Sequence, residues 1–381
     1  MKQGWVIKKL GDVASYINGF AFKPEHWNDE GMPIIRIQNL NNPDALYNYC
    51  NIDIPSKYIV ESGDILISWS ASLGVYEWKG ENAYLNQHIF KVVFDKIPIN
   101  KFFLKYAVGA KINEMLKDAH GATMKHVVKK DFDNTKIIYP PLPEQERIVA
   151  ELDCLSSIIE KQKEQLKELD NLAQAIFYDM FGSVDDNYRD YKSKPLIEVF
   201  SIIKDGTHQT PQYTDDKVNG FKFLSAKDVV SGAIDWTNIK YIPEALHNEL
   251  YQRVAPKRND ILLCKNGTYG ICALVETDEI FDIYVSLALL RPLDTFVPKY
   301  LVYAINSPST KQQFDKSIKG IGVPNLHLGE IKRTKILTPP LSLQQEFASK
   351  IEAIEKQKEL IKQSLAETEI LFNSRMDYYF N

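Results

Sequence analysis

Residues 121–142 read GATMKHVVKKDFDNTKIIYPPL, and residues 320–341 read GIGVPNLHLGEIKRTKILTPPL. The offset between them is a constant 199 positions. A shorter match relates GDILI at 63–67 to NDILL at 259–263. Self-similarity over this distance indicates two duplicated domains and not a short-period solenoid. A duplicated chain suits a ligand that is itself repeated and inverted, and duplex DNA is the commonest ligand of that kind.

Composition bounds the class of protein. The chain has 381 residues and is 44% hydrophobic, which is enough to bury two cores of ordinary domain size. No apolar run approaches the roughly 18 residues of a membrane span, and the segment MKQGWVIKKLGDV lacks the apolar stretch of a signal peptide. Cys50, Cys154, Cys264 and Cys272 form no CxxC pair and have no histidine at a zinc-ligand spacing. We therefore expect a cytoplasmic protein with reduced cysteines and no metal site.

The charge pattern gives two opposing indications. A net charge of −4 argues mildly against a nucleic-acid protein, since isolated DNA-binding domains tend to be basic. Much of the acid lies in two helical segments, however, and short basic clusters lie in the globular parts, at 125–130, 257–258, 316–319 and 332–335. A solvated surface explains any one cluster. Their recurrence at matching places in both repeats favours DNA.

A heptad pattern follows the first Pro-Pro-Leu. Its apolar seam consists of Ile148, Leu152, Leu155, Ile159, Gln162, Leu166, Leu169, Ala173, Ile176 and Met180. Such spacing is typical of a coiled coil. Prolines and the acidic residues Glu144 and Glu146 favour a helix start near Pro143, and Gly182 favours its end.

The second copy of this helix has a less regular seam. Its members are Phe347, Ile351, Ile354, Ile361, Leu365, Thr368 and Phe372, and Lys358 interrupts it. Two such helices in one chain offer each other a partner, so we predict an antiparallel coiled-coil pair; the alternative is that each helix packs on its own domain. Gln162 and Gln357 occupy corresponding places and are expected to help fix the register.

The globular parts alternate short apolar strands with turns. Strands are expected at 33–37, 64–68 and 88–93 with a helix at 100–116, and again at 221–225, 260–264 and 285–290 with a helix at 299–305. Each part is therefore predicted to be α+β. The expected organisation is a first domain at 1–141, a helix at 142–182, a linker at 183–190, a second domain at 191–340 and a second helix at 341–381.

These features together resemble a known family. Trp5 and LGDV at 10–13 open the first repeat, GDILI at 63–67 follows, and IIYPPLPEQERI at 137–148 leads into the helix. This order resembles the DNA-specificity subunit of type I restriction-modification systems, over essentially the whole chain. The second copy departs from the pattern, with Leu-Gln-Gln at 343–345 in place of Glu-Gln-Glu.

The resemblance implies a division of labour. Two target-recognition domains would each read one half of an asymmetric bipartite site in double-stranded DNA, and the helices would set the spacing and dock two methyltransferase subunits. Motor-nuclease subunits would join for cleavage. S-adenosylmethionine, ATP and magnesium would be bound by those partners, so this chain is expected to hold no cofactor and to be no enzyme.

The residues themselves support a non-catalytic interpretation. An adenine methyltransferase needs Asp or Asn before Pro-Pro and an aromatic residue after it, but the chain has Tyr-Pro-Pro-Leu at 139–142 and Thr-Pro-Pro-Leu at 338–341. No GxxxxGK[ST] phosphate loop occurs. Asp44 with Glu77 and Lys79 is the nearest approach to a nuclease metal site, and the second repeat has no counterpart. A free-standing methyltransferase or nuclease and a coiled-coil scaffold without DNA specificity remain as alternatives.

Candidate DNA contacts are polar and aromatic residues near strand ends. In the first domain they are Asn18, Lys23, Arg36, Gln38, Asn39, Trp69, Ser70, Ser72, Lys125 and His126. In the second they are Lys204, Asp205, Thr207, His208, Gln209, Lys227, Lys265, Asn266, Thr268, Tyr269, Asn325 and His327. Arg, Lys, Asn and Gln read purine edges, while Ser and Thr hold phosphate. For each residue the competing interpretation is a turn residue that caps its own loop.

Overall fold

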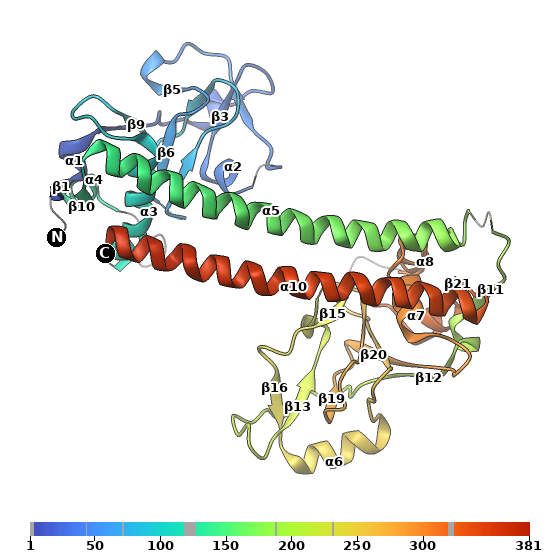
Figure 1. Ribbon diagram of the computed structural model, residues 1–381. Coiled ribbons are helices and arrows are strands. Elements are labelled where there is room, and N and C mark those ends of the chain that lie inside the picture. The colour runs from blue at the N-terminus through green and yellow to red at the C-terminus, as the bar shows by residue number, and fades with distance from the viewer. Residues whose placement is uncertain are drawn as a thin grey trace. The chain divides into compact units, whose positions relative to one another are not determined.

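The computed structural model describes residues 4–42, 44–70, 72–117, 127–186, 189–230, 232–318 and 324–381. It divides into two compact units. The first unit comprises Met1–Lys163 with Lys362–Asn381, and the second comprises Glu164–Ile361. Each unit holds one globular domain and part of each long helix (Figure 1). The division therefore falls within the helices and not at their ends.

The first domain contains two four-stranded sheets. One is antiparallel, in the order β2 (Ser15–Asn18), β9 (Ile89–Val93), β6 (Ile65–Ser68) and β7 (Gly74–Glu77). The other has the order β4 (Asn48–Cys50), β3 (Met32–Ile35), β8 (Ala83–Leu85) and β5 (Ile59–Val60), with β3 and β8 parallel. The helices are α1 (Leu10–Val13), α2 (Ile37–Asn41), α3 (Lys101–Lys117) and α4 (Lys129–Asn134), with short 3-10 turns at Pro24–His26 and Ser56–Tyr58.

The second domain repeats the strand order of the main sheet and the parallel strand pair, while its second sheet has three described strands in place of four. Its main sheet has the order β12 (Phe200–Asp205), β20 (Leu287–Pro292), β17 (Ile261–Cys264) and β18 (Cys272–Leu274). A second sheet has the order β16 (Lys240–Ile242), β13 (Phe221–Leu224) and β19 (Phe281–Ile283), with β13 and β19 parallel, and a small hairpin joins β14 (Val229–Val230) to β15 (Ala233–Ile234). The helices are α6 (Glu244–Arg253), α7 (Pro298–Asn306), α8 (Pro308–Ser317) and α9 (Leu328–Arg333), with 3-10 turns at Leu196–Glu198 and Ala226–Asp228. The matching strand orders confirm the duplicated α+β fold.

A short antiparallel ladder closes each domain. In the first, β1 (Val6–Lys9) pairs with β10 (Lys136–Tyr139). In the second, β11 (Ser193–Pro195) pairs with β21 (Lys335–Leu337). The chain therefore enters and leaves each domain at one place, directly before the following long helix.

The long helices α5 (Leu142–Phe181) and α10 (Leu341–Phe380) run antiparallel in each unit. In the first unit, Tyr379 Oη donates a 2.6 Å hydrogen bond to Glu151, and Lys163 forms a 2.9 Å ion pair with Glu369. In the second unit, the ring of Phe347 lies 5.6 and 5.5 Å from those of Phe177 and Phe181. The predicted antiparallel pair of long helices is confirmed.

The helices also complete the domain cores. Every residue of both predicted seams is buried or half-buried. Ile148 and Leu152 lie in the core of the first unit with Tyr379 and Phe380, whereas Phe347 lies in the core of the second. The helices thus pair with each other and also pack on the domains, so the two arrangements weighed from the sequence coexist.

The expectation for Gln357 was wrong. Gln162 lies in the seam and donates a 2.8 Å hydrogen bond to Ser364 Oγ, but Gln357 is exposed. The seam of α10 passes through the neighbouring Lys358, which pairs with Asp170 of α5. The heptad spacing of α10 therefore decides which side chain faces the partner helix, and the local Glu-Lys-Gln-Lys match does not.

A buried glutamine explains the Pro-Pro-Leu-x-x-Gln motif. The Gln145 carboxamide accepts from the Asn100 N–H at 2.9 Å and donates to the Pro140 carbonyl at 2.8 Å. Gln344 repeats this, accepting from Val297 N–H at 3.0 Å and donating to the Pro339 carbonyl at 2.9 Å. Each glutamine therefore ties the start of a long helix to the start of a domain helix. The departure at 343–345 leaves this contact intact.

Candidate nucleic-acid interface

The two domains have the same backbone arrangement at the ends of two main-sheet strands. These strands are β2 and β6 in the first domain and β12 and β17 in the second. Gly19 follows β2 and Gly206 follows β12, and a Cβ at these glycines would lie 2.2 Å from the Asn86 carbonyl oxygen and 2.0 Å from that of Ile283. No side chain fits there. The strand ends are therefore held close to the parallel pairs β3·β8 and β13·β19, and residues 18 and 205 occupy equivalent positions.

Trp69 and Lys265 also occupy equivalent positions, because their backbones make matching hydrogen bonds. Trp69 N–H donates to the His88 carbonyl, and Lys265 N–H donates to the Ser286 carbonyl, at 3.3 and 2.8 Å. Their own carbonyls accept from Val127 and Leu326, at 3.1 and 2.9 Å. Each therefore follows its strand, β6 or β17, and lies beside the segment that precedes α4 or α9.

The first domain carries a neutral pair at this point. Trp69 Nε1 donates a 3.0 Å hydrogen bond to Asn18 Oδ1. Its ring stacks on Phe90, with centroids 5.7 Å apart and planes at 27°, and lies 5.4 Å from the His88 ring. The described pair in the first domain is thus aromatic and amide in character, and the nearby Lys129 Nζ lies 5.6 Å from the Phe90 ring.

The second domain carries an ionic cluster at the equivalent point. Lys265 Nζ lies 2.9 Å from Asp205 Oδ2, and both side chains are at least nine-tenths buried. His208 Nε2 lies 3.1 Å from the same oxygen, and Arg253 of α6 lies 3.2 Å from Oδ1. One carboxylate therefore contacts two basic side chains and an imidazole.

The pKa of Asp205 depends on two opposing effects, burial of the carboxyl group and the nearby basic side chains. Burial alone would raise it, but the hydrogen bond and charge of Lys265, with a smaller contribution from His208, outweigh burial and leave the pKa below its ordinary value. The carboxylate is therefore ionised at neutral pH and keeps Lys265 in place.

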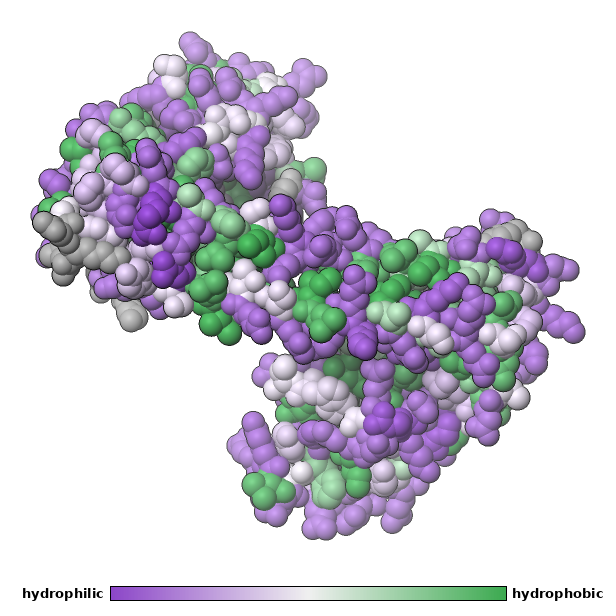
Figure 2. Space-filling model, viewed as in Figure 1, coloured by the Kyte–Doolittle hydropathy of each residue, from purple (hydrophilic) through white to green (hydrophobic). Residues whose placement is uncertain are grey.

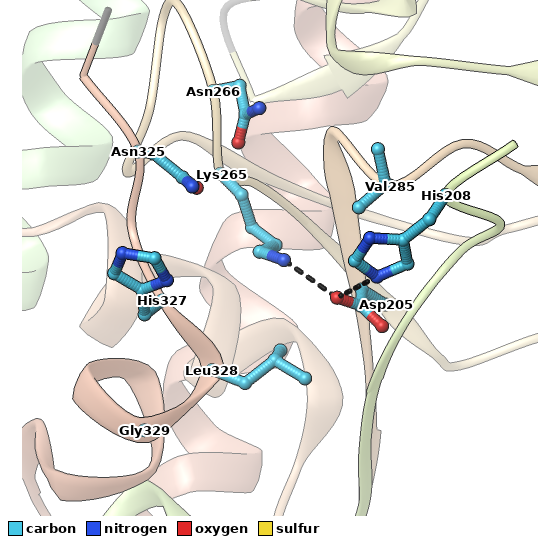
Figure 3. Close-up of a pocket in the computed structure, with 9 residues that line it drawn as sticks. All are labelled: Asp205, His208, Lys265, Asn266, Val285, Asn325, His327, Leu328 and Gly329. Atoms are coloured by element: carbon cyan, nitrogen blue, oxygen red, sulfur yellow. Dashed lines mark hydrogen bonds and ion pairs between the residues drawn. The ribbon is translucent and has the colours of Figure 1, made fainter. Parts of the chain in front are cut away.

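A cavity of about 560 Å³ opens over this cluster. Its lining consists of Asp205, His208, Lys265, Asn266, Val285, Asn325, His327, Leu328 and Gly329, and we call it the Lys265 cavity. Figure 3 shows the Lys265 ammonium and the His208 ring meeting at Asp205, with the Asn325 and His327 side chains on the opposite side. Asn266 and Asn325 belong to facing segments joined by an antiparallel bridge. Six residues predicted as DNA contacts, Asp205 among them, thus line one cavity and come from three separate segments.

The candidates as a whole differ in accessibility. The exposed ones are Asn18, Lys23, Gln38, Ser72, Lys204, His208, Gln209, Lys227, Thr268, Asn325 and His327. Those that are half-buried are Arg36, Trp69, Asn266 and Tyr269, and those that are buried are Asn39, Ser70, Asp205, Thr207 and Lys265. Lys125 and His126 lie outside the described residues.

Several candidates have structural partners. Asn39 accepts from the Arg36 N–H at 3.0 Å and donates to the carbonyls of Ala45 and Leu46, so it caps its own loop. Arg36, expected on a strand, instead precedes α2 and donates to Asn48 Oδ1 at 3.1 Å. Tyr269 Oη donates to Asp315 of α8 at 2.7 Å. For these residues the structure supports a capping or packing role.

Arg253 was missed from the sequence. It lies at the end of α6, and the first domain has no helix of that length between the equivalent strands β4 and β6. The repeat therefore gave no signal for it. Within the described ranges, no group of three or more His, Cys, Asp or Glu side chains could hold a metal ion, and no helix is long and apolar enough to cross a membrane.

Comparison with known proteins identifies the family. The model described as the type I restriction modification DNA specificity domain matches residues 2–170 and 188–369. The EcoBI specificity subunit of Escherichia coli is 24% identical over 376 residues, covering 92% of this chain and 79% of the relative. The MjaVIII specificity subunit of Methanocaldococcus jannaschii is 23% identical over 374 residues, covering 93% and 86%.

Solved structures share the fold. The S subunit of a type I restriction-modification system from M. genitalium has a TM-score of 0.57 at 14% identity, covering 99% of this chain and 96% of that one. A chain from work on complex assembly and conformational transition of the type I system has a TM-score of 0.56 at 18% identity, covering 99% and 97%. Relatives of this kind are the non-catalytic subunits of their enzymes, so the expectation that this chain is no enzyme is confirmed. With both of its repeats matched, the chain belongs to the type I restriction-modification DNA specificity family and carries two target-recognition domains.

Proposed function

We propose that each domain reads one half of an asymmetric bipartite site in double-stranded DNA, and that α5 and α10 set the spacing between the halves. The observation that carries this is the pair of equivalent points with different chemistry. Asn18 with Trp69 in one domain and Asp205 with Lys265 in the other occupy the same place in the same fold. Matching main sheets with different side chains at their strand ends suit two different half-sites.

The long helices support a second part of the proposal, docking of two methyltransferase subunits. Both carry apolar side chains that the domains leave exposed: Leu172, Leu360, Ile370 and Leu371. Figure 2 shows green patches along the helices between hydrophilic surfaces. Exposed apolar groups rimmed by polar ones are typical of protein–protein interfaces. Motor-nuclease subunits would join this assembly for cleavage, and the complex would act in the cytoplasm.

The test is a domain exchange. Residues 191–340 would be replaced by the matching region of another specificity subunit, and the chimaera would be expressed with the methyltransferase subunits of this system. The two closing ladders make these boundaries suitable because the chain enters and leaves the domain at one place. Methylome sequencing should then show one half-site changed and the other unchanged.

A matched exchange of residues 1–141 provides the control, because it should change the opposite half-site. Loss of both half-sites in two folded chimaeras would mean that the domains do not read DNA independently. A continuous motif or a palindrome for the parent chain would contradict the bipartite asymmetric site. Absence of any sequence preference would favour the scaffold alternative.

A further inference from the structure

The Lys265 cavity contains a buried ammonium with unused donors. An ammonium has three N–H groups. Among the described residues, Asp205 is the one hydrogen-bond partner of Lys265 Nζ. The lysine side chain is 6% exposed and lines the cavity. Donors remain available towards the cavity, so its floor is suited to a group rich in acceptor oxygens.

The charges point to an anion. Asp205 carries one negative charge, whereas Lys265 and Arg253 carry one positive charge each, so the cluster has an excess of one positive charge before either histidine is considered. Arg253 itself does not line the cavity and supplies its charge from the other side of the carboxylate. Asp205 already engages both of its oxygens, Oδ2 with Lys265 and His208 and Oδ1 with Arg253. Its charge is therefore offset by the cations that it contacts, although its side chain also lines the cavity.

From this geometry we propose that the Lys265 cavity binds one backbone phosphate of the DNA, with Lys265 at its floor and Asn325 and His327 at its rim. This deepens the proposed function and rests on it. A base edge inside a duplex lies in a groove and cannot descend to a buried ammonium, whereas phosphate oxygens project from the backbone. Lysine, asparagine and histidine side chains supply the N–H donors that phosphates accept.

Among the described residues, the first domain carries a different pair at the equivalent point. Trp69 replaces Lys265, and indole has a single N–H, which is donated to Asn18. No charge and no free donor remain in that pair. The proposed contact through a buried ammonium therefore belongs to the second domain, because the described pair of the first domain offers no ammonium at that point.

Salt dependence tests the contact. The intact chain, assembled with its methyltransferase subunits, would be titrated with its own DNA site between about 50 and 200 mM KCl. Each neutralised phosphate contributes about 0.9 to the slope of log K against log salt in B-DNA. Lys265→Met should therefore reduce the slope by about 0.9 and leave the methylated motif unchanged. Lys356→Met, which removes an exposed lysine of α10 in the same unit, should leave the slope unchanged.

A methylphosphonate scan identifies the phosphate. Replacing single phosphates of the second half-site by neutral methylphosphonates should reveal one position that weakens binding of the wild-type complex but not of Lys265→Met. Additive losses at every position, or an unchanged slope with intact binding, would overturn the proposal. A changed motif with an unchanged slope would show that Lys265 reads a base.

Two controls separate failure of the inference from other failures. If circular dichroism shows that Lys265→Met does not fold, Asp205→Asn with Lys265→Met restores a neutral pair like that of the first domain and carries the same expectation. If the wild-type complex shows no salt-sensitive preference for any DNA sequence, the proposed function itself fails, and the phosphate contact with it.

Discussion

Removing the Gln344 side chain should destabilise the second unit selectively. The carboxamide is 1% exposed and bonds Val297 N–H and the Pro339 carbonyl. Gln344→Ala leaves both groups without a hydrogen-bond partner beside the core. Each unsatisfied group lowers the free energy of unfolding by about 1–3 kcal/mol. The expected loss is about 2–6 kcal/mol, which at about 3 kcal/mol per molar urea lowers the midpoint of that unit by about 1–2 M.

The measurement is hydrogen exchange of the intact chain at increasing urea, read by mass spectrometry. Peptides of the first unit serve as an internal reference, because Gln145 there keeps both of its hydrogen bonds. The matched control is Gln345→Ala, which removes the same side chain from the neighbouring exposed position and should change stability by less than about 0.5 kcal/mol. Equal losses for Gln344→Ala and Gln345→Ala would refute the reasoning.

Four further outcomes are expected. Inserting four residues after Glu164 adds roughly 6 Å of helix and should lengthen the methylated spacer by one or two base pairs, while two residues should abolish assembly by turning the seam away; an active complex with an unchanged spacer would contradict this. Because the folded-state pKa of Asp205 is lowered, its contribution to stability is present above about pH 4 and is lost as the pH falls through the folded pKa; Asp205→Asn should therefore show a smaller drop in free energy of unfolding between about pH 7 and pH 3 than the wild type, and equal drops would count against it. The isolated chain should neither methylate nor cleave DNA with methyl donor, ATP and magnesium, and replacing Glu77 and Lys79 by alanine should leave reconstituted cleavage intact; loss of cleavage with DNA binding retained would revive a nuclease. Ile370→Asp on α10 should weaken binding of a methyltransferase subunit by at least about tenfold, measured by calorimetry, and unchanged affinity would exclude that surface.

Much of the architecture could be predicted because it depends on patterns repeated within the chain. The Pro-Pro-Leu stretches marked both helix starts, and the heptad spacing identified side chains that the structure buries or half-buries. Phe177 and Phe181 were outside the predicted seam, yet both contact Phe347. A heptad describes the face towards one partner helix, and these two rings are in the core that the helices share with the second domain.

The candidate site was predicted only in part, because side-chain partners come from distant segments. The sequence identified His208, Lys265, Asn266, Asn325 and His327 as separate loop residues, and nothing in their spacing indicated one cavity. The equivalence of Trp69 and Lys265 was also invisible, since it depends on matched backbone hydrogen bonds and not on residue type. Asn39 illustrates the opposite error, because a polar residue at a strand end can serve its own loop.

The end of α10 completes the core of the first unit, although the ribosome makes it last. Tyr379 and Phe380 are part of the core of the first unit, together with Ile148 and Leu152. A ribosome adding about 5–20 residues per second needs roughly 10–40 s to pass from Lys163 to Lys362, where the remainder of that unit begins. Throughout this interval the first domain has an uncovered apolar face, although its own strands are already made. The domain that is translated first is therefore the one completed last, and the nascent chain must protect that face until the second domain has been synthesised.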